Sequence, residues 1–419
     1  MGRQFYSLCD DLNPRHVINY KMTSETQTTF PIQGSDAVKV YNDFQDMSLI
    51  PDQLLRGIYA HGFEKPSEIQ KRGIMPIAEG RDVIAQAQSG TGKTGTFTIG
   101  SMCRIDPKLA EVQVLVIVPT HELAKQHYDT AVGVGAYMKV KVHAARGKHP
   151  VREDIKAIQD GCQFLVGTPG RIYDLCHRGV LKRDHIQVLI LDEADQMLED
   201  KFQEQVLAIL SLGFPKTTRV CLFSATWPPE IVKFTDGILQ DPVRILIEKT
   251  SEVPLAGIKQ YFVPLDQEEW KFETLCDVYS QLTINQCMIF CNKQSRADWL
   301  AMKMKSANFT LECLHGGMAA EERDKKMDDF RKGSCRVLIT TDIMARGIDV
   351  QQVETVINFD VPLDKANYIH RIGRAARYGR KGTTINFVGP NEARQQEEIE
   401  SYWHTKWETL PRDLSTVGV

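Results

Sequence analysis

The sequence predicts an α/β protein of two domains, each a doubly wound, mainly parallel sheet flanked by helices. Short apolar runs that end in small or polar clusters alternate with amphipathic helical patterns along most of the chain. A glycine-rich string of the phosphate-binding type directly follows the first of these runs. The chain has 419 residues, 42% of them hydrophobic and 25% charged, which suffices for two full-sized cores.

The N-terminal part of the chain divides into an extension and a first domain. Residues 1–36 are polar, weakly patterned and interrupted by Pro14, Pro31 and Gly34, which predicts a flexible extension. We expect order to begin near Val38 and the first domain to span 37–246. Its predicted strands are the apolar runs at 83–87, 112–118, 164–166, 188–191, 220–223 and 243–247.

A polar stretch with Pro254 and Gly257 predicts an interdomain linker over 247–257. A second alternating series follows and predicts the domain 258–419. Its expected strands are the runs at 258–263, 288–291, 311–314, 337–340, 356–359 and 384–388. This half has no second Gly-Lys followed by Ser or Thr, so we expect one nucleotide site in the chain.

The string AQSGTGKT at 87–94 predicts a P-loop. Its small residues let backbone N–H groups turn toward phosphate oxygens, and a helix that opens at Gly92 adds a positive N-terminal end. We expect Lys93 to reach the terminal phosphates and Thr94 to bind Mg²⁺ through its hydroxyl. The alternative, an accidental match, remains because the first position is Ala87. The predicted phosphate-binding residues are Ser89, Gly90, Thr91, Gly92, Lys93 and Thr94.

The string LDEAD at 191–195 supplies the carboxylates that such a loop requires. The apolar run before it places Asp192 at the carboxyl end of a buried strand, where it can hold Mg²⁺ largely through water. Glu193 can orient or deprotonate an attacking water. The alternative is a solvated acidic turn, which the P-loop upstream disfavours.

The second half carries an arginine cluster, HRIGRAARYGR, at 370–380. Arg374 and Arg377 are three residues apart and would share one helical face. Presented across a cleft, they can act as arginine fingers, which contribute about 10³ to 10⁵ in rate to nucleotide hydrolases. The alternative is a basic, solvated helix end.

Charge and cysteine content narrow the class of protein. The net charge of −3 excludes a generally basic coat, so any nucleic-acid contact must come from a local face. The ten cysteines include no CxxC pair, which disfavours a zinc site and favours a reducing, cytoplasmic setting, with the nucleus as a second possibility. No apolar run reaches the roughly 18 residues of a membrane span, so we expect no membrane partner.

Taken together, the motifs resemble those of the DEAD-box RNA helicases, most closely the translation initiation factor 4A branch. The resemblance runs from Phe44 to the C-terminus and includes GFEKPSEIQ, AQSGTGKT, PTHELA, TPGR, LDEAD, SAT, TTDIMARGIDV and HRIGRAARYGR in the family's order. It implies two RecA-like domains that close on ATP, Mg²⁺ and single-stranded RNA or a short RNA duplex. The implied activity is RNA-stimulated ATP hydrolysis with local unwinding by a monomer, and the implied partner is a HEAT-repeat scaffold of the initiation factor 4G type.

The resemblance also implies residue roles. Gln70 would contact the adenine edge while Phe44 stacks on the base, although Gln70 can equally be a polar residue at a helix N-terminus and Phe44 a core aromatic. Asp349 would contact the ribose, and His370 would link the nucleotide to the neighbouring domain. The implied coupling residues are Ser224 and Thr226. The implied RNA contacts are Thr120, Gly147, Thr168, Arg171, Thr341 and Arg346.

Several positions depart from the family pattern. His121 replaces an arginine on the expected RNA face, and Lys148 replaces the second glycine of a Gly-Gly turn, so both join the candidate RNA contacts. Ala320 and Ala376 replace a glutamine and a glycine. These departures leave open a second hypothesis, an ATP-gated RNA clamp of low turnover that serves as a ribonucleoprotein scaffold. A small-molecule phosphotransferase is disfavoured because it gives the second half no role.

Overall fold

The structure is a computed structural model of the chain. It describes residues 38–87, 90–147, 149–198, 200–227, 235, 237–246, 257–282, 286–345, 353–375, 382–412 and 414. The predicted extension at 1–36 and nearly all of the predicted linker lie outside these residues. No described helix combines the length and apolar character needed to cross a bilayer.

The first domain is built on a parallel sheet of seven strands in the order β3-β4-β2-β5-β6-β1-β7. Its strands are β1 Val83–Gln86, β2 Val114–Ile117, β3 Val142–Ala145, β4 Phe164–Gly167, β5 Val188–Asp192, β6 Arg219–Ser224 and β7 Val243–Leu246. Its helices are η1 Phe44–Asp46, α1 Asp52–Ala60, α2 Glu68–Ala78, α3 Lys93–Met102, α4 His121–Val134, α5 Val151–Gln159, α6 Pro169–His177, α7 Ala194–Met197 and α8 Asp200–Ser211.

The second domain repeats this plan with the order β10-β11-β9-β12-β13-β8-β14. Its strands are β8 Ile258–Pro264, β9 Cys287–Phe290, β10 Glu312–Leu314, β11 Val337–Thr340, β12 Thr355–Asn358, β13 Gly382–Val388 and β14 Glu408–Thr409. Its helices are α10 Trp270–Gln281, α11 Gln294–Ser306, α12 Ala320–Arg331, η2 Asp342–Met344, α13 Lys365–Ile372 and α14 Ala393–Trp403. Numbered by chain order within each domain, the two sheets have the same strand sequence, 3-4-2-5-6-1-7.

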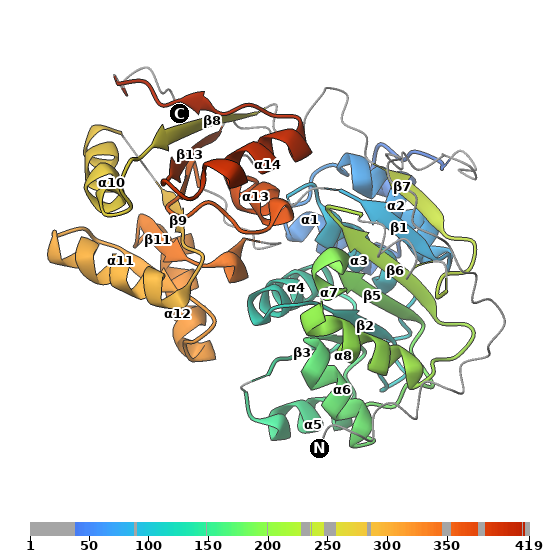
Figure 1. Ribbon diagram of the computed structural model, residues 1–419. Coiled ribbons are helices and arrows are strands. Elements are labelled where there is room, and N and C mark those ends of the chain that lie inside the picture. Colours follow the sequence, from blue (N-terminus) through green and yellow to red (C-terminus); the bar gives the residue numbers. More distant parts are fainter. Residues whose placement is uncertain are drawn as a thin grey trace, which may run out of the picture. The chain divides into compact units, whose positions relative to one another are not determined.

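Alternate residues of each central strand enter different cores, as a sheet covered on both faces requires. In β2, Val114 and Val116 belong to one hydrophobic cluster, whereas Leu115 and Ile117 belong to another. Figure 1 shows helices on both faces of the first sheet, which is coloured from blue to yellow-green. The predicted α/β class with two doubly wound parallel sheets is therefore confirmed.

All predicted apolar runs form strands, with boundaries that agree to within two residues. Two strands were not predicted. β3 is an edge strand whose residues 142–144 are only partly buried, so its sequence VHAA lacks a continuous apolar run. β14 has two exposed residues and is held mainly by backbone pairing with β8.

Candidate nucleotide and RNA site

The phosphate loop connects β1 to α3 at the carboxyl edge of the first sheet. α3 begins at Lys93, and Gly92 caps it with a left-handed backbone, φ 102°. A Cβ at Gly92 would lie 2.6 Å from Ser67 Oγ and 2.8 Å from Gln70 Nε2, so backbone angle and space both require glycine. The predicted helix start at the end of the loop is confirmed, while Ser89 lies outside the described residues.

A buried group of charges adjoins this loop. Lys93 Nζ lies 3.3 Å from Glu193 Oε1, and Asp192 Oδ2 lies 2.8 Å from Nε2 of His127. Burial alone would lower the pKa of Lys93, but the charges of Glu193, Asp192 and Asp195 outweigh it and raise that pKa. Burial likewise opposes ionisation of Asp192, yet the hydrogen bond from His127 and the charge of Lys93 hold its pKa below the usual value. Lys93 and Asp192 are therefore both charged at neutral pH.

Glu193 adopts an uncommon backbone conformation. Its φ of 54° and ψ of 52° are left-handed, which costs a non-glycine residue about 1 kcal/mol or more. This turn follows the last residue of β5 and caps α7. Strain of this kind is concentrated at functional sites, and here it accompanies the approach of Glu193 to Lys93.

Two carboxylate oxygens of this group have no hydrogen-bond partner within the described part of the chain: Asp192 Oδ1 and Glu193 Oε2. A buried polar atom without a partner is costly and indicates a ligand or an ordered water. Carboxylate oxygens are the donors that Mg²⁺ prefers, and Thr94, half-buried in the first turn of α3, offers a hydroxyl. The residues present therefore fit a Mg²⁺ ion.

The last aspartate of LDEAD joins the predicted coupling residues. Thr226 Oγ1 donates to Asp195 Oδ2 at 2.6 Å, and the backbone N–H of Asp195 donates to Ser224 Oγ at 3.3 Å. Nε2 of His370, from the second domain, lies 3.3 Å from the same Asp195 oxygen. Sequence reasoning had assigned no role to Asp195, because its contact with SAT depends on β5 and β6 being neighbours in the sheet.

Phe44 takes the alternative position in the core, whereas Gln70 lies in the first turn of α2 and its adenine contact stays a prediction. The Gln70 side chain accepts from Ser67 N at 2.9 Å and donates to Gly92 O at 3.3 Å, so it completes the capping box of α2 and supports the phosphate loop. The expectation for Phe44 is corrected: its ring is fully buried in the core beside Tyr59 and Phe63 and has no face for a base.

Phe63 is the aromatic that borders the loop. Its ring is partly exposed, and Cζ would lie 3.1 Å from a Cβ placed on Gly95 in the first turn of α3. Phe63 is the second residue of GFEKPSEIQ, so this motif places an aromatic side chain as well as Gln70 beside the start of α3.

The helical position expected for Arg374 is also corrected. α13 ends at Ile372, and Arg374 follows in a turn in which its N–H bonds to Arg371 O. The side chain is buried, and Nε donates to His370 O at 3.2 Å. Glycine at 373 weakens helix continuation, which explains the early end. Arg377 and Asp349 lie outside the described residues.

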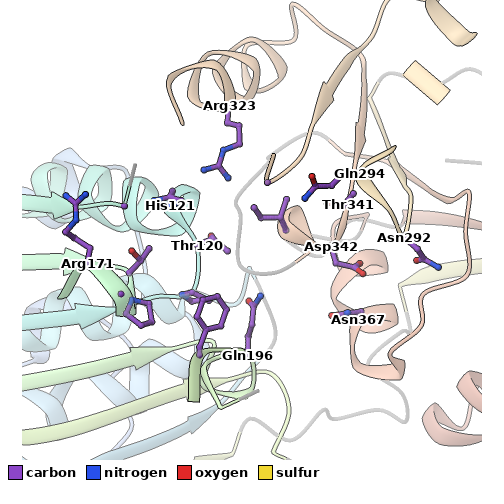
Figure 2. A pocket seen from close by; sticks show the side chains of 18 of the residues that line it. Thr120, His121, Arg171, Gln196, Asn292, Gln294, Arg323, Thr341, Asp342 and Asn367 are labelled. Atoms are coloured by element: carbon purple, nitrogen blue, oxygen red, sulfur yellow. The ribbon is translucent and has the colours of Figure 1, made fainter. Parts of the chain in front are cut away.

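A cavity of about 790 Å³ is lined by residues from the carboxyl ends of strands in both sheets (Figure 2). Every described residue among the candidate RNA contacts lines it: Thr120, His121, Gly147, Thr168, Arg171 and Thr341. Lys148 and Arg346 lie outside the described residues.

Three threonines of this cavity are helix N-caps. Thr120 caps α4 by accepting from Leu123 N at 3.3 Å, Thr168 precedes Pro169 at the start of α6, and Thr341 precedes η2. The first residues of α4 and α6 line the cavity, and the positive dipole ends of these helices favour phosphate oxygens. Arg171 is less free to move, since its guanidinium donates to Asp154 and to His149 O.

Two parallel sheets with one P-loop, a Lys–Glu–Asp group behind it and a polar cavity at their strand ends define a two-domain P-loop nucleotide hydrolase. Residues 67–234 match the DEAD/DEAH box helicase family, and residues 270–379 match the helicase conserved C-terminal domain. The chain is 50% identical to the ATP-dependent RNA helicase eIF4A of Aspergillus clavatus over 90% of its own length and 94% of the relative's. The chain therefore belongs to the DEAD/DEAH box helicase family.

Two further relatives agree with this assignment. The ATP-dependent RNA helicase FAL1 of Candida glabrata is 50% identical over 92% of this chain and 97% of that protein. Among solved structures, S. cerevisiae Dbp5 bound to RNA and ADP BeF₃ has a TM-score of 0.81 at 34% identity and covers 90% of this chain and 97% of its own. The tandem RecA-like fold is thus confirmed.

Proposed function

We propose that this protein is an ATP-dependent RNA helicase that hydrolyses ATP with Mg²⁺ and locally separates short RNA duplexes. The observation that carries the proposal is the buried group of Lys93, Asp192 and Glu193 directly behind the phosphate loop. The relatives reported above, of which this chain covers 94% or more, are named for this activity.

The chemistry follows from the residues of the first domain. Backbone N–H groups at Gly90 to Gly92 and the ammonium of Lys93 bind the phosphates. Glu193 orients a water and takes its proton as the new bond to the γ-phosphorus forms and the bond to the β–γ bridging oxygen breaks. Asp192 and Thr94 would hold Mg²⁺, which supplies positive charge to the phosphate oxygens.

Residues of the second domain would complete this site. Arg374 and Arg377 are the candidate arginine fingers, and Asp349 is the candidate ribose contact. His370 already lies against Asp195, whose carboxylate also accepts from Thr226. A movement of the second domain on ATP binding would therefore alter the contact between His370 and Asp195. Through the Asp195 carboxylate it would also alter the hydrogen bond from Thr226 of SAT.

RNA would bind in the cavity through its backbone. Threonine N-caps and helix N-termini contact phosphates and 2′-hydroxyls without reading bases, so binding should be independent of sequence. ATP and RNA would both favour the closed state, and hydrolysis would release it.

The cellular role rests on the names of the relatives. We propose a cytoplasmic role in translation initiation or messenger-RNA metabolism, with the nucleus as a second setting. A HEAT-repeat scaffold of the initiation factor 4G type is the proposed protein partner, and a monomer suffices because both domains of one chain form the site.

The second candidate, an ATP-gated RNA clamp, draws on the altered positions. His121 provides no fixed charge in the cavity, and Ala320, buried at the start of α12, offers no polar group. A clamp would retain ATP-dependent RNA binding while turning over slowly.

ATP turnover with and without single-stranded RNA separates these candidates, with Glu193→Gln as the control for contaminating activity. A helicase gives RNA-stimulated turnover that falls about 10³-fold in the control and disappears in EDTA. Slow turnover with retained analogue-dependent RNA binding would establish the clamp. Loss of both would contradict the proposal.

A further inference from the structure

His127 is a buried histidine that belongs to none of the recognised sequence motifs of the nucleotide site. It lies in the second turn of α4, its side chain is 1% exposed, and Nε2 is 2.8 Å from Asp192 Oδ2. Asp192 is the residue proposed above to hold Mg²⁺. A histidine in contact with this carboxylate requires an explanation, because an apolar side chain would fill the same space without desolvating two polar groups.

The chemistry of the pair fixes the direction of the hydrogen bond. An ionised carboxylate only accepts, so Nε2 must carry the proton and donate it. Nδ1 is buried without a hydrogen-bond partner in the described chain. When the proton of the neutral ring is on Nε2, Nδ1 carries a lone pair and is an acceptor. No buried N–H group of the neutral ring is then left without a partner.

The imidazole itself is held in place. The rings of Phe97 and His127 meet edge to face, with centroids 5.2 Å apart and planes at 73°. Phe97 in turn packs on Phe223 at 5.2 Å. A donor fixed by its helix and by one packed aromatic ring can hold its acceptor in one orientation.

One oxygen of Asp192 is thereby occupied and the other is left available. Oδ2 accepts from His127, whereas Oδ1 is buried and has no described partner. We propose that His127 is a positioning residue for the metal site. Its hydrogen bond fixes the Asp192 carboxylate so that Oδ1 remains the oxygen for the hydrated Mg²⁺ ion. This inference rests on the proposed role of Asp192 at the metal.

The test compares His127→Gln with His127→Met in the full chain. The two side chains match in length and shape, but only the Gln amide can donate a hydrogen bond near the position of Nε2. The affinity of a fluorescent ADP analogue is measured across a Mg²⁺ titration and in EDTA. We expect His127→Met to weaken the apparent Mg²⁺ affinity about tenfold, at the lower end of effects for such supporting residues, and His127→Gln to restore most of it.

The EDTA arm separates positioning from packing. A purely structural role would weaken nucleotide binding equally with and without Mg²⁺, whereas the proposal predicts a change only with Mg²⁺. If His127→Met fails to fold, His127→Asn replaces it, because the shorter amide cannot reach Asp192 from the same backbone position. Equal Mg²⁺ affinity for the donating and non-donating variants would overturn the proposal.

The Asp192→Asn variant distinguishes failure of this inference from failure of the metal assignment. If Asp192 holds Mg²⁺ and His127 acts through it, Asp192→Asn alters the Mg²⁺ dependence and His127→Met adds nothing further in that background. If Asp192→Asn alters the dependence and His127→Met does not, the positioning role is wrong and the metal role stands. If Asp192→Asn itself has no effect, the metal assignment fails and this inference with it.

Discussion

Two lysines occupy matching positions in the two domains and have different surroundings. Lys93 is the first residue of the helix after the first strand of its sheet, and Lys271 is the second residue of the corresponding helix in the other sheet. Both are buried, and each lies near a carboxylate just after the fifth strand: Lys93 is 3.3 Å from Glu193, and Lys271 is 3.7 Å from Asp360.

The difference lies in the rest of the surroundings. Lys271 is also 2.6 Å from Glu392 and 3.2 Å from Glu268, so the protein's own carboxylates surround it. Glu193 is the one carboxylate that the described residues place within ion-pair distance of Lys93. The loop before Lys93 contains Gly90 and Gly92 with positive φ, whereas 265–269 reads LDQEE and has no glycine. The same topology therefore yields one phosphate site and one structural ion cluster.

At a second matching position the domains remain alike. Thr168 follows the fourth strand of the first sheet and Thr341 the fourth strand of the second, and both are helix N-caps that line the cavity. The two halves therefore diverge where ATP is expected and correspond where RNA is expected.

Lys93→Met should reduce ATP turnover more than any other substitution considered below. Removing a charge that stabilises the transferring phosphoryl group should lower ATP turnover on the order of 10³-fold. Steady-state turnover with saturating RNA measures this effect. Turnover within tenfold of the unaltered protein would show that Lys93 does not have the role in phosphoryl transfer that distinguishes it from Lys271.

Lys271→Met should instead destabilise the second domain. Removing the cation takes its 2.6 Å ion pair from Glu392. Arg296 still pairs with Glu268 and Asp360, so the loss should be about 2 kcal/mol of unfolding free energy. Urea titration measures the loss, and turnover per folded molecule should be unchanged. A specific fall in ATP affinity would show that Lys271 also serves a nucleotide.

Thr168→Val and Thr341→Val test the resemblance between the domains. Each removes one hydroxyl from the cavity and should weaken RNA affinity by about 1 kcal/mol, or roughly fivefold. Fluorescence anisotropy with a single-stranded RNA and an ATP analogue measures both. If only one variant weakens binding, the two positions are not equivalent.

The smallest effect is expected for His121→Arg. A fixed charge at the start of α4 should strengthen RNA binding a few-fold and steepen its salt dependence by about one unit in the logarithmic slope. Affinity measured at several salt concentrations checks this, with turnover in the absence of RNA as the control. An unchanged salt slope would place His121 away from the RNA backbone.

Much of this could be predicted because the signals were local. The strands followed from continuous apolar runs, and the loop and carboxylates from short strings whose chemistry depends on neighbouring residues. Even the capping role of Gln70 was visible as Ser-x-x-Gln at 67–70.

What could not be predicted depends on contacts between distant segments. The pairing of Asp195 with Thr226 requires the order of β5 and β6, and the contact of His127 with Asp192 joins residues 65 positions apart. A lone histidine within a helix carries no sequence signal of its partner. The role of Phe44 also depends on tertiary packing, because its sequence position is equally compatible with the core and with stacking on a base. Its complete burial places it in the core.

Two domains of the same topology should contain only one ATP site. Calorimetry with a non-hydrolysable ATP analogue and Mg²⁺ tests this most directly, because it measures the number of sites per chain. We expect one site per chain, which is lost in Lys93→Met and retained in Lys271→Met. Two sites, or one site that survives Lys93→Met and disappears in Lys271→Met, would contradict this expectation.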